Sequence, residues 1–232
     1  MDFRPVFMVI GILLSTLAVM MVVPAAFDLY DGHPDWEVFL ISGGVTLFVG
    51  VGTALTCRTG GGRMMARQAF VMTTLSWMAL VFFASLPLKF SELNLSFTDA
   101  IFEAMSGLTT TGSTVITGLD QAPSGVLIWR ALLQWLGGIG IIVMAIAVLP
   151  MLRVGGMQLF QLDTSGTEKI LPKTVEISVL IISIYTSLTI VCAFMYWLQG
   201  MSAFDSIAHS FTTLATGGFS THNESIGFFN NP

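Results

Sequence analysis

EAMSGLTTTGSTVITGLD, residues 103–120, is a polar stretch in a strongly apolar chain. It gathers threonine, serine and glycine and carries no charge from Thr109 to Thr117. The whole chain has 232 residues, of which 54% are hydrophobic and 10% are charged, and its mean hydropathy is +0.82. This composition is too apolar for a soluble domain of this length and is typical of a polytopic membrane protein.

Five apolar stretches have the roughly 20 residues that a helix needs to cross a hydrocarbon core of about 30 Å. They are residues 6–27, 36–56, 68–88, 125–149 and 175–198. The first could instead be a secretory signal, because Arg4 precedes it, but its apolar run is longer than the core of such a signal. We therefore expect a retained helix.

The positions of the cations predict the orientation of these helices. Cations and acids occupy alternate ends of successive apolar stretches; the cations are Arg4, then Arg58, Arg63 and Arg67, then Arg153, Lys169 and Lys173. Because cytoplasmic loops are rich in Lys and Arg, the amino terminus is expected in the cytoplasm. Residues 151–174 then form a cytoplasmic connection.

Several classes of function have no support in the sequence. The net charge is -5 and no basic stripe is present, so nucleic acid is not an expected partner. Cys57 and Cys192 lie far apart on different apolar stretches and suggest neither a disulfide framework nor a cysteine metal site. His33, His209 and His222 lack metal-ligand spacing, so a packing or hydrogen-bonding role is expected for His209.

The polar stretch has a second copy in the chain. A shift of 106 residues places SFTDAIFEAMSGLTTTGST (96–114) over SAFDSIAHSFTTLATGGFS (202–220). Each copy opens with Ser-x-x-Asp, in which the serine oxygen accepts backbone N–H groups and the acid favours the positive end of a helix. We therefore expect two helices, over residues 97–108 and 203–214.

These helices are too short to span a membrane, since 12 residues reach only about 18 Å. They can enter from the outer side and hand over to a non-helical strand, provided that protein or water surrounds it. The carboxyl end of such a helix favours a cation, and a turn containing Gly112 or Gly218 can expose backbone carbonyls to one side. The alternative is an ordinary polar outer loop, which is also rich in Gly, Ser and Thr.

This order of segments resembles the potassium-translocating subunits of the Trk/Ktr/HKT superfamily and is most similar to the bacterial TrkH/TrkG type. The motifs that carry the resemblance are TTTGST (109–114), ATGGFS (215–220) and WRALLQWLGGIGIIV (129–143). The implied fold is an all-α polytopic membrane protein with repeated units of membrane helix, re-entrant pore helix, filter loop and membrane helix, preceded by two extra transmembrane helices. On this basis, residues 1–67 hold the two extra helices, 68–150 the first repeat, 151–174 the connection and 175–232 the second repeat.

The resemblance also implies a function. It is potassium uptake across the bacterial cell inner membrane through a carbonyl-lined filter, with no catalytic residue and no cofactor. The filter residues carried over are Thr110, Thr111 and Gly112 in the first strand and Thr216, Gly217 and Gly218 in the second. The resemblance adds coupling to H⁺ or Na⁺, a homodimer in the lipid membrane, and a cytosolic TrkA-like nucleotide-binding regulatory subunit.

Superfamily members build one pore from four such repeats. Here the chain continues after Phe219 only through STHNESIGFFNNP (220–232), so we expect a fragment with two of four filter strands, the second repeat ending after its filter loop. A different class of function is a non-transporting membrane scaffold or a membrane enzyme. An enzyme requires clustered acids, His or Cys in a shared cavity, whereas the acids here lie mostly at segment ends.

Two features of residues 125–149 leave alternatives open. Arg130 lies inside this apolar stretch, where it can snorkel outward, the simpler expectation, or pair with Glu103 behind the first filter strand. Gly137, Gly138 and Gly140 lack the context of a dinucleotide-binding loop. We expect these glycines to allow close helix packing.

Overall fold

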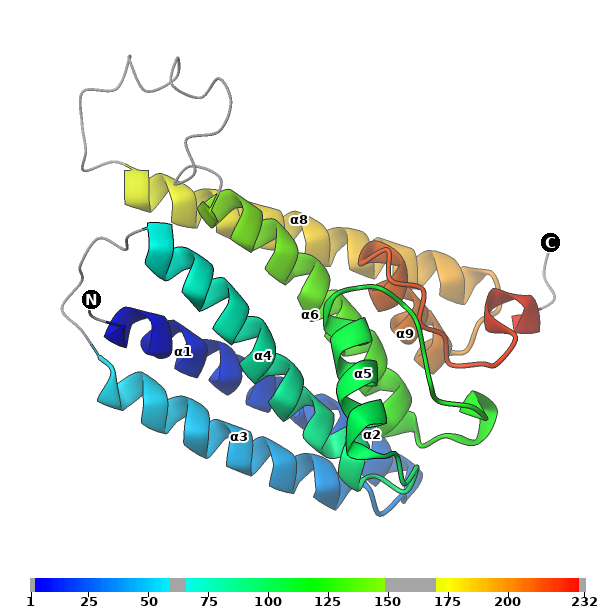
Figure 1. Ribbon diagram of the computed structural model, residues 1–232. Coiled ribbons are helices and arrows are strands. Elements are labelled where there is room, and N and C mark those ends of the chain that lie inside the picture. The colour runs from blue at the N-terminus through cyan, green and yellow to red at the C-terminus, as the bar shows by residue number, and fades with distance from the viewer. Residues whose placement is uncertain (1–2, 59–65, 149–169, 230–232) are drawn as a thin grey trace.

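The regular secondary structure is all helical in the residues that the computed structural model describes, which are 3–58, 66–148 and 170–229. These ranges contain helices and loops and no β-strand. Figure 1 shows the arrangement, with long helices lying roughly alongside one another and two short helices beside them. In chain order the elements are α1 (Arg4–Met20), α2 (Val22–Asp31), α3 (Trp36–Thr56), α4 (Ala66–Phe90), α5 (Phe97–Leu108), η1 (Leu119–Gln121), α6 (Ser124–Val148), α8 (Ile170–Leu198), α9 (Ala203–Leu214) and η3 (Ser225–Phe229).

The long helices confirm the membrane class. Within the described ranges, four stretches are long and apolar enough to cross a bilayer, namely Arg4–Asp31, Trp36–Thr56, Arg67–Phe90 and Val179–Leu198. The fifth predicted stretch is also helical, as α6, but it is not among these four spans. The chain is therefore a multi-pass membrane protein.

The boundaries differ from the predictions most in the first span and in α8. The first span ends at Asp31 and not at the predicted residue 27. The first span is divided at Met21 into α1 and α2, and α8 begins at Ile170, five residues before the predicted start at position 175. Most of the predicted cytoplasmic connection, residues 151–169, and the turn at residues 59–65 lie outside the described residues.

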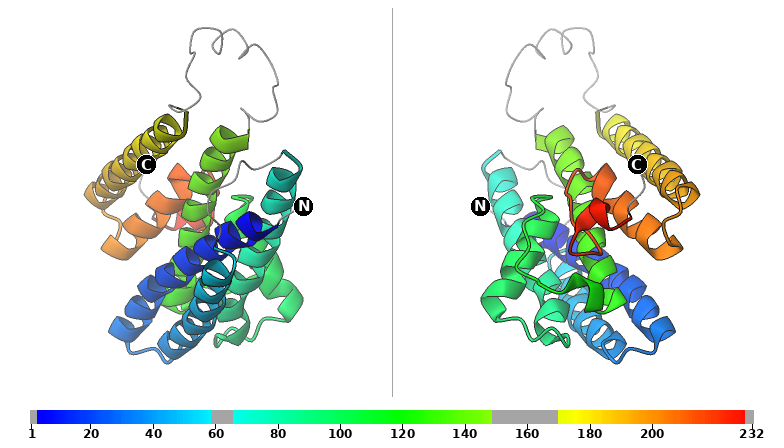
Figure 2. Two further views of the ribbon diagram at one scale, coloured as in Figure 1. Left: turned by 90° about the vertical axis from the view of Figure 1, so that its left-hand side faces the viewer. Right: turned by 90° about the vertical axis from the view of Figure 1, so that its right-hand side faces the viewer.

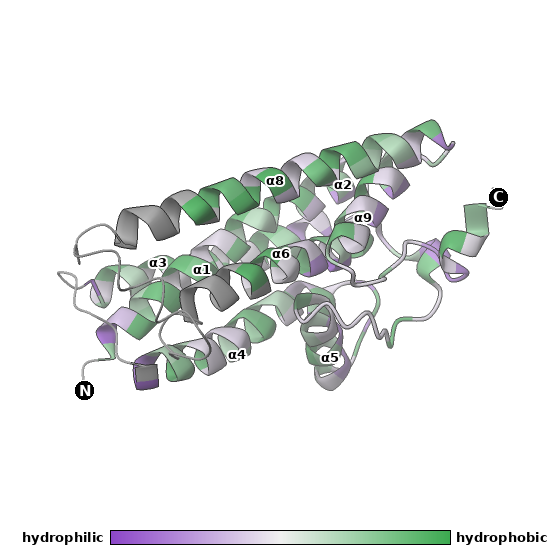
Figure 3. Cartoon of the chain, turned by 90° about the horizontal axis from the view of Figure 1, so that it is seen from above, coloured by the Kyte–Doolittle hydropathy of each residue, from purple (hydrophilic) through white to green (hydrophobic). Residues whose placement is uncertain are grey.

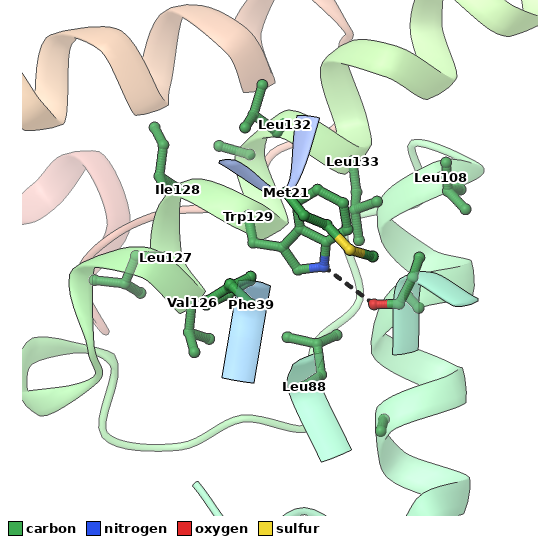
Figure 4. Close-up of a cluster of buried hydrophobic side chains, with 14 of the residues drawn as sticks. Met21, Phe39, Leu88, Leu108, Val126, Leu127, Ile128, Trp129, Leu132 and Leu133 are labelled. Carbon is green, nitrogen blue, oxygen red and sulfur yellow. Dashed lines mark hydrogen bonds between the residues drawn. The ribbon is translucent and has the colours of Figure 1, made fainter. Parts of the chain in front are cut away.

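Helix α6 is the central element. In the two views of Figure 2, α8 and α9 lie on one side of α6 and α4 and α5 lie on the other. Trp129 of α6 is fully buried, and its indole nitrogen donates to the Ala84 carbonyl oxygen of α4 at 3.0 Å, the dashed line in Figure 4. Its ring also meets Phe39 of α3 edge-on, with centroids 6.1 Å apart. Because lipid tails are as apolar as these side chains, close packing and hydrogen bonding hold this cluster together.

The outer surface of the bundle is apolar, as contact with lipid requires. Figure 3 shows hydrophobic residues predominating along the coloured part of α8. Large apolar side chains of this helix, such as Leu188, Ile190 and Phe194, are more than half exposed. Several buried polar side chains, such as Glu103, His209 and Ser210, lie on α5 and α9, and these helices with the loops that follow them form the candidate site.

Candidate functional site

The two short helices have the predicted bounds, residues 97–108 and 203–214, and begin in the same way. In α5, the Ser96 hydroxyl oxygen accepts from the Asp99 backbone N–H at 3.1 Å and donates to the Asp99 carboxylate at 2.6 Å. In α9, Ser202 makes the same two bonds with Asp205, at 3.0 and 2.7 Å. The predicted helix start is therefore confirmed in both copies, and each start places a carboxylate at the positive end of a helix.

The two helices also end in the same way. Each closes with a pair of backbone hydrogen bonds that forms a Schellman motif. In this motif the N–H group two residues beyond the cap donates to the carbonyl oxygen five residues earlier, and the N–H group one residue beyond the cap donates to the carbonyl oxygen three residues earlier. The bonds are Thr111 N to Ser106 O (3.0 Å) and Thr110 N to Gly107 O (3.0 Å) in α5, and Gly217 N to Thr212 O (2.9 Å) and Thr216 N to Thr213 O (2.9 Å) in α9. The two loops that follow these helices, which are the predicted filter loops, thus leave them along the same backbone path.

Left-handed backbone conformations recur at matched positions. Gly112 and Gly218 have φ values of +79° and +81°, a conformation that glycine adopts without a Cβ clash. Thr110 and Thr216 have φ values of +56° and +54°, which the sequence did not predict. This conformation costs a side chain with a Cβ atom roughly 1–2 kcal/mol. Two β-branched residues held in it at equivalent places indicate a backbone shape that the surrounding structure imposes.

The two filter loops meet at one point. A Cβ atom added to Gly112 would lie 1.9 Å from the carbonyl oxygen of Gly217, so the two backbones are in direct contact there. The side chain of Gln134 on α6 lies against Gly217, and a Cβ atom added to Gly217 would lie 2.3 Å from it. Thr111 is exposed, and its hydroxyl lies 2.8 Å from that of Thr109. The structure therefore brings Gly112 and Gly217 together, while Gly218 faces open space.

Glycines of α6 allow the ends of both short helices to approach it. A Cβ atom on Gly137 would lie 1.9 Å from the Leu108 carbonyl oxygen of α5. A Cβ atom on Gly138 would lie 2.7 Å from the Tyr185 hydroxyl oxygen and 3.3 Å from Ala215. The predicted packing role is confirmed for these two glycines, since any side chain there would displace the filter loops.

The expectation that Arg130 snorkels outward is wrong. Arg130 is 1% exposed, and its Nε atom donates to the Glu103 carboxylate, which is 0% exposed, at 2.7 Å. The helix faces α5 at this level, so the guanidinium has no path to the surface and pairs with the acid instead. Glu103 also accepts from the Thr114 hydroxyl at 2.8 Å and the Val115 backbone N–H at 3.0 Å. The ion pair therefore lies directly behind the exit of the first filter loop.

His209 occupies the position of Glu103 in the second copy. Its Nδ1 atom lies 2.9 Å from the Asp205 carbonyl oxygen, which can only accept, so Nδ1 carries a proton. In the neutral ring, Nε2 then accepts from the Ser220 hydroxyl at 3.1 Å. This bond matches the one between Glu103 and Thr114, and the predicted hydrogen-bonding role of His209 is confirmed.

The outer ends of the two filter loops are also joined. The Asp120 carboxylate accepts from the His222 ring at 2.8 Å and from the Asn223 side-chain amide. The hydrogen bond from His222 is the main reason that the pKa of Asp120 is lowered; burial opposes it, and the hydrogen bond from Asn223 lowers the pKa further. Asn223 in addition accepts from the Leu119 backbone N–H at 3.0 Å.

Beside the second loop lies a cavity of about 290 Å³, lined in part by His209, Gly218 and Ile226.

Sequence reasoning missed one residue that contacts the filter loops directly. Gln134 accepts from the Phe219 backbone N–H at 3.1 Å and is fully buried. The available signal was its spacing, since Arg130 and Gln134 are four residues apart and so lie on one face of an otherwise apolar helix. Among the described residues, no group of three or more His, Cys, Asp or Glu side chains is arranged to hold a metal ion.

Comparison with known proteins yields one family. The model of the TrkH family, described as a cation transport protein, matches residues 36–232. The chain is 42% identical to the Trk system potassium uptake protein TrkH of Halomonas elongata, over 99% of this chain and 48% of that protein. It is 38% identical to the Trk system potassium uptake protein TrkG of Escherichia coli K12, over 95% of this chain and 46% of that protein.

A solved structure agrees with these matches. The crystal structure of the potassium transporter TrkH from Vibrio parahaemolyticus superposes with a TM-score of 0.89 at 41% identity, covering all of this chain and 47% of that one. The chain thus spans about half the length of the relatives that it matches. With the family model matching most of its length, the chain belongs to the TrkH family of cation transport proteins.

Proposed function

We propose that this chain supplies two of the four filter strands of a Trk-type system that takes up potassium across the bacterial cell inner membrane. The observation that carries the proposal is the meeting of two matched loops at Gly112 and Gly217, each behind a short capped helix. The strands are residues 110–112 and 216–218, and their backbone carbonyls are the proposed ligands of K⁺. The ion is the transported substrate, and no cofactor is required.

The local geometry suits a cation that has lost part of its water. The negative ends of α5 and α9 lie next to the two loops, and a helix carboxyl end carries about half a negative charge. Backbone carbonyls replace the hydration shell of K⁺, and several weak sites in series allow the ion to leave. The left-handed residues in each loop set the direction of neighbouring carbonyls, which accounts for the strained threonines at these positions.

The proposal extends to the rest of the system. Residues 1–67, 68–150, 151–174 and 175–232 form the two leading helices, the first repeat, the cytoplasmic connection and the second repeat. The amino terminus lies in the cytoplasm. The working transporter is a homodimer that couples K⁺ uptake to H⁺ or Na⁺ and binds a TrkA-like nucleotide-binding subunit on its cytoplasmic face. Support comes from the distribution of Lys and Arg and from the likeness to Trk system proteins.

A fusion protein tests the function. Residues 1–232 are continued by the half of the Vibrio parahaemolyticus relative that lies beyond the matched region, and uptake of K⁺ and Na⁺ is measured in reconstituted vesicles. We expect uptake that favours K⁺ and a Gly112→Val variant that loses this preference, because a β-branched residue at positive φ misdirects the carbonyls.

The matched control for that experiment is Thr117→Val, which places the same side chain at an exposed position beyond the filter and should leave the K⁺ preference unchanged. Equal K⁺ and Na⁺ uptake by the unmodified fusion would refute a filter role. Uptake of neither ion would favour a non-transporting membrane scaffold.

A further inference from the structure

The buried Glu103–Arg130 pair is an unexpected feature for a site whose function depends on backbone carbonyls. Removing two charges from water costs as much as or more than their attraction returns, so a buried ion pair is weak support for stability alone. Its presence is better explained by what the remaining donors of the guanidinium hold in place. Arg130 has five N–H donors in a rigid fork, and only one of them is used by Glu103 through Nε.

The other donors of Arg130 reach both filter loops. The NH2 nitrogen donates to the Thr114 hydroxyl of the first loop at 3.0 Å. The NH1 nitrogen donates to the Ser220 carbonyl oxygen of the second loop, 90 residues away in sequence, at 3.1 Å. The guanidinium carbon also lies 4.2 Å from the ring centroid of Phe219, within the range of a cation–π contact. One side chain thus joins the two loops from behind.

The second copy does not repeat this charge arrangement. Where α5 has Glu103, α9 has His209, whose ring forms hydrogen bonds with Ser220 of its own loop and with Asp205 of its own helix. A second buried carboxylate would leave one negative charge without a partner, which is costly at this depth. The second loop therefore depends on the cation of the first repeat, together with Gln134 one helical turn away.

We infer that Arg130 is a positioning residue that sets the spacing of the two filter strands, and through it the preference for K⁺ over Na⁺. This inference rests on the proposed function for its effect on ions. The coupling of the two loops can be tested without reference to any ion.

The coupling test uses the 232-residue chain in detergent and measures backbone hydrogen exchange in residues 110–116 and 216–220. In Arg130→Lys, one ammonium keeps the charge beside Glu103 but cannot imitate the fork that reaches both loops. We expect exchange in both segments to rise at least about tenfold, the factor that corresponds to one lost charge-assisted hydrogen bond. The double variant Glu103→Met with Arg130→Met should give the same result without leaving an unpaired buried charge.

The matched control is Lys89→Met. Lys89 is a half-buried cation that donates to the Leu95 carbonyl oxygen at 2.9 Å, away from both loops. It should leave exchange in both segments unchanged. If the Arg130 variants loosen only the first segment, Arg130 is an anchor of one loop and the coupling is refuted. If they loosen neither, Arg130 has no positioning role.

The consequence for ions is measured in the fusion protein. Arg130→Lys should lower the ratio of K⁺ to Na⁺ uptake about tenfold, while the amount of protein in the membrane stays unchanged. A residue that merely stabilises the fold would instead lower the amount of protein and leave the ratio intact, and that result would overturn the inference. An unmodified fusion without K⁺ preference would refute the proposed function, whereas the exchange result would still decide whether Arg130 couples the loops.

Discussion

Replacing Gly112 by alanine should destabilise the chain more than the same change at Gly218. Both glycines have φ near +80°, so alanine meets a similar backbone cost of roughly 1–2 kcal/mol at each. Their surroundings differ. A Cβ atom at Gly112 would lie 1.9 Å from the carbonyl oxygen of Gly217, whereas a Cβ atom at Gly218 would meet no atom within 4 Å.

The contact at Gly112 cannot be relieved by a side-chain rotation, because the obstructing atom belongs to the backbone. Ordinary contact begins near 3.4 Å, so the two loops would have to separate by about 1.5 Å. Gly217 cannot retreat, since Gln134 already packs behind it. Overpacking of this kind costs about 1–3 kcal/mol, which places the total for Gly112→Ala at about 2–5 kcal/mol.

The assay is thermal unfolding of the purified 232-residue chain in detergent, followed by tryptophan fluorescence. About 1 kcal/mol corresponds to ~2–4 °C for a chain of this size, so Gly112→Ala should unfold several degrees below Gly218→Ala. Gly118→Ala is a second control, with φ of +76° and no atom within 4 Å of the added Cβ. Equal melting temperatures for the three variants would refute the contact between the filter loops.

Three further predictions concern topology, transport and acid stability. In a variant whose native cysteines are replaced, new cysteines beside Arg63 and Lys169 should be labelled only from the cytoplasm, and one beside Asp120 only from outside; labelling beside Asp120 from inside would contradict the re-entrant arrangement. A polypeptide consisting only of residues 1–232 should insert into membranes without K⁺-selective flux, because two strands cannot replace a full hydration shell; selective flux from it would show that two copies complete one pore. Because His222 lowers the pKa of Asp120, the stability advantage over Asp120→Asn should be full above pH 3.8 and disappear as the pH falls through the lower folded pKa; an advantage that persists at about pH 2 would show that the hydrogen bond acts without the charge.

The amino-acid sequence by itself determined the features that depend on local physics. Composition placed the chain in a membrane, because apolar content needs no knowledge of contacts. The starts of α5 and α9 followed from Ser-x-x-Asp signals, whose hydrogen bonds span three residues. The absence of a Cβ atom made a positive φ available to Gly112 and Gly218, and both adopt it.

Tertiary structure alone decided which polar groups meet. The partners of Arg130 lie 16 to 90 residues away in sequence, beyond the reach of any periodic pattern. Asp28 stands in sequence among acids assigned to segment ends, yet it is fully buried and accepts from the Gly125 backbone N–H at the start of α6, at 2.6 Å.

The backbone conformation of the threonines that follow α5 and α9 was also decided by the tertiary structure and not by the sequence. Intrinsic preference argues against a left-handed β-branched residue, so the sequence could not predict Thr110 and Thr216 in that conformation. The packing of both helix ends against the glycines of α6, together with the paired backbone bonds, outweighs that preference. A cost of 1–2 kcal/mol at one residue is small beside the many contacts that close packing provides, and these contacts exist only once the helices have assembled.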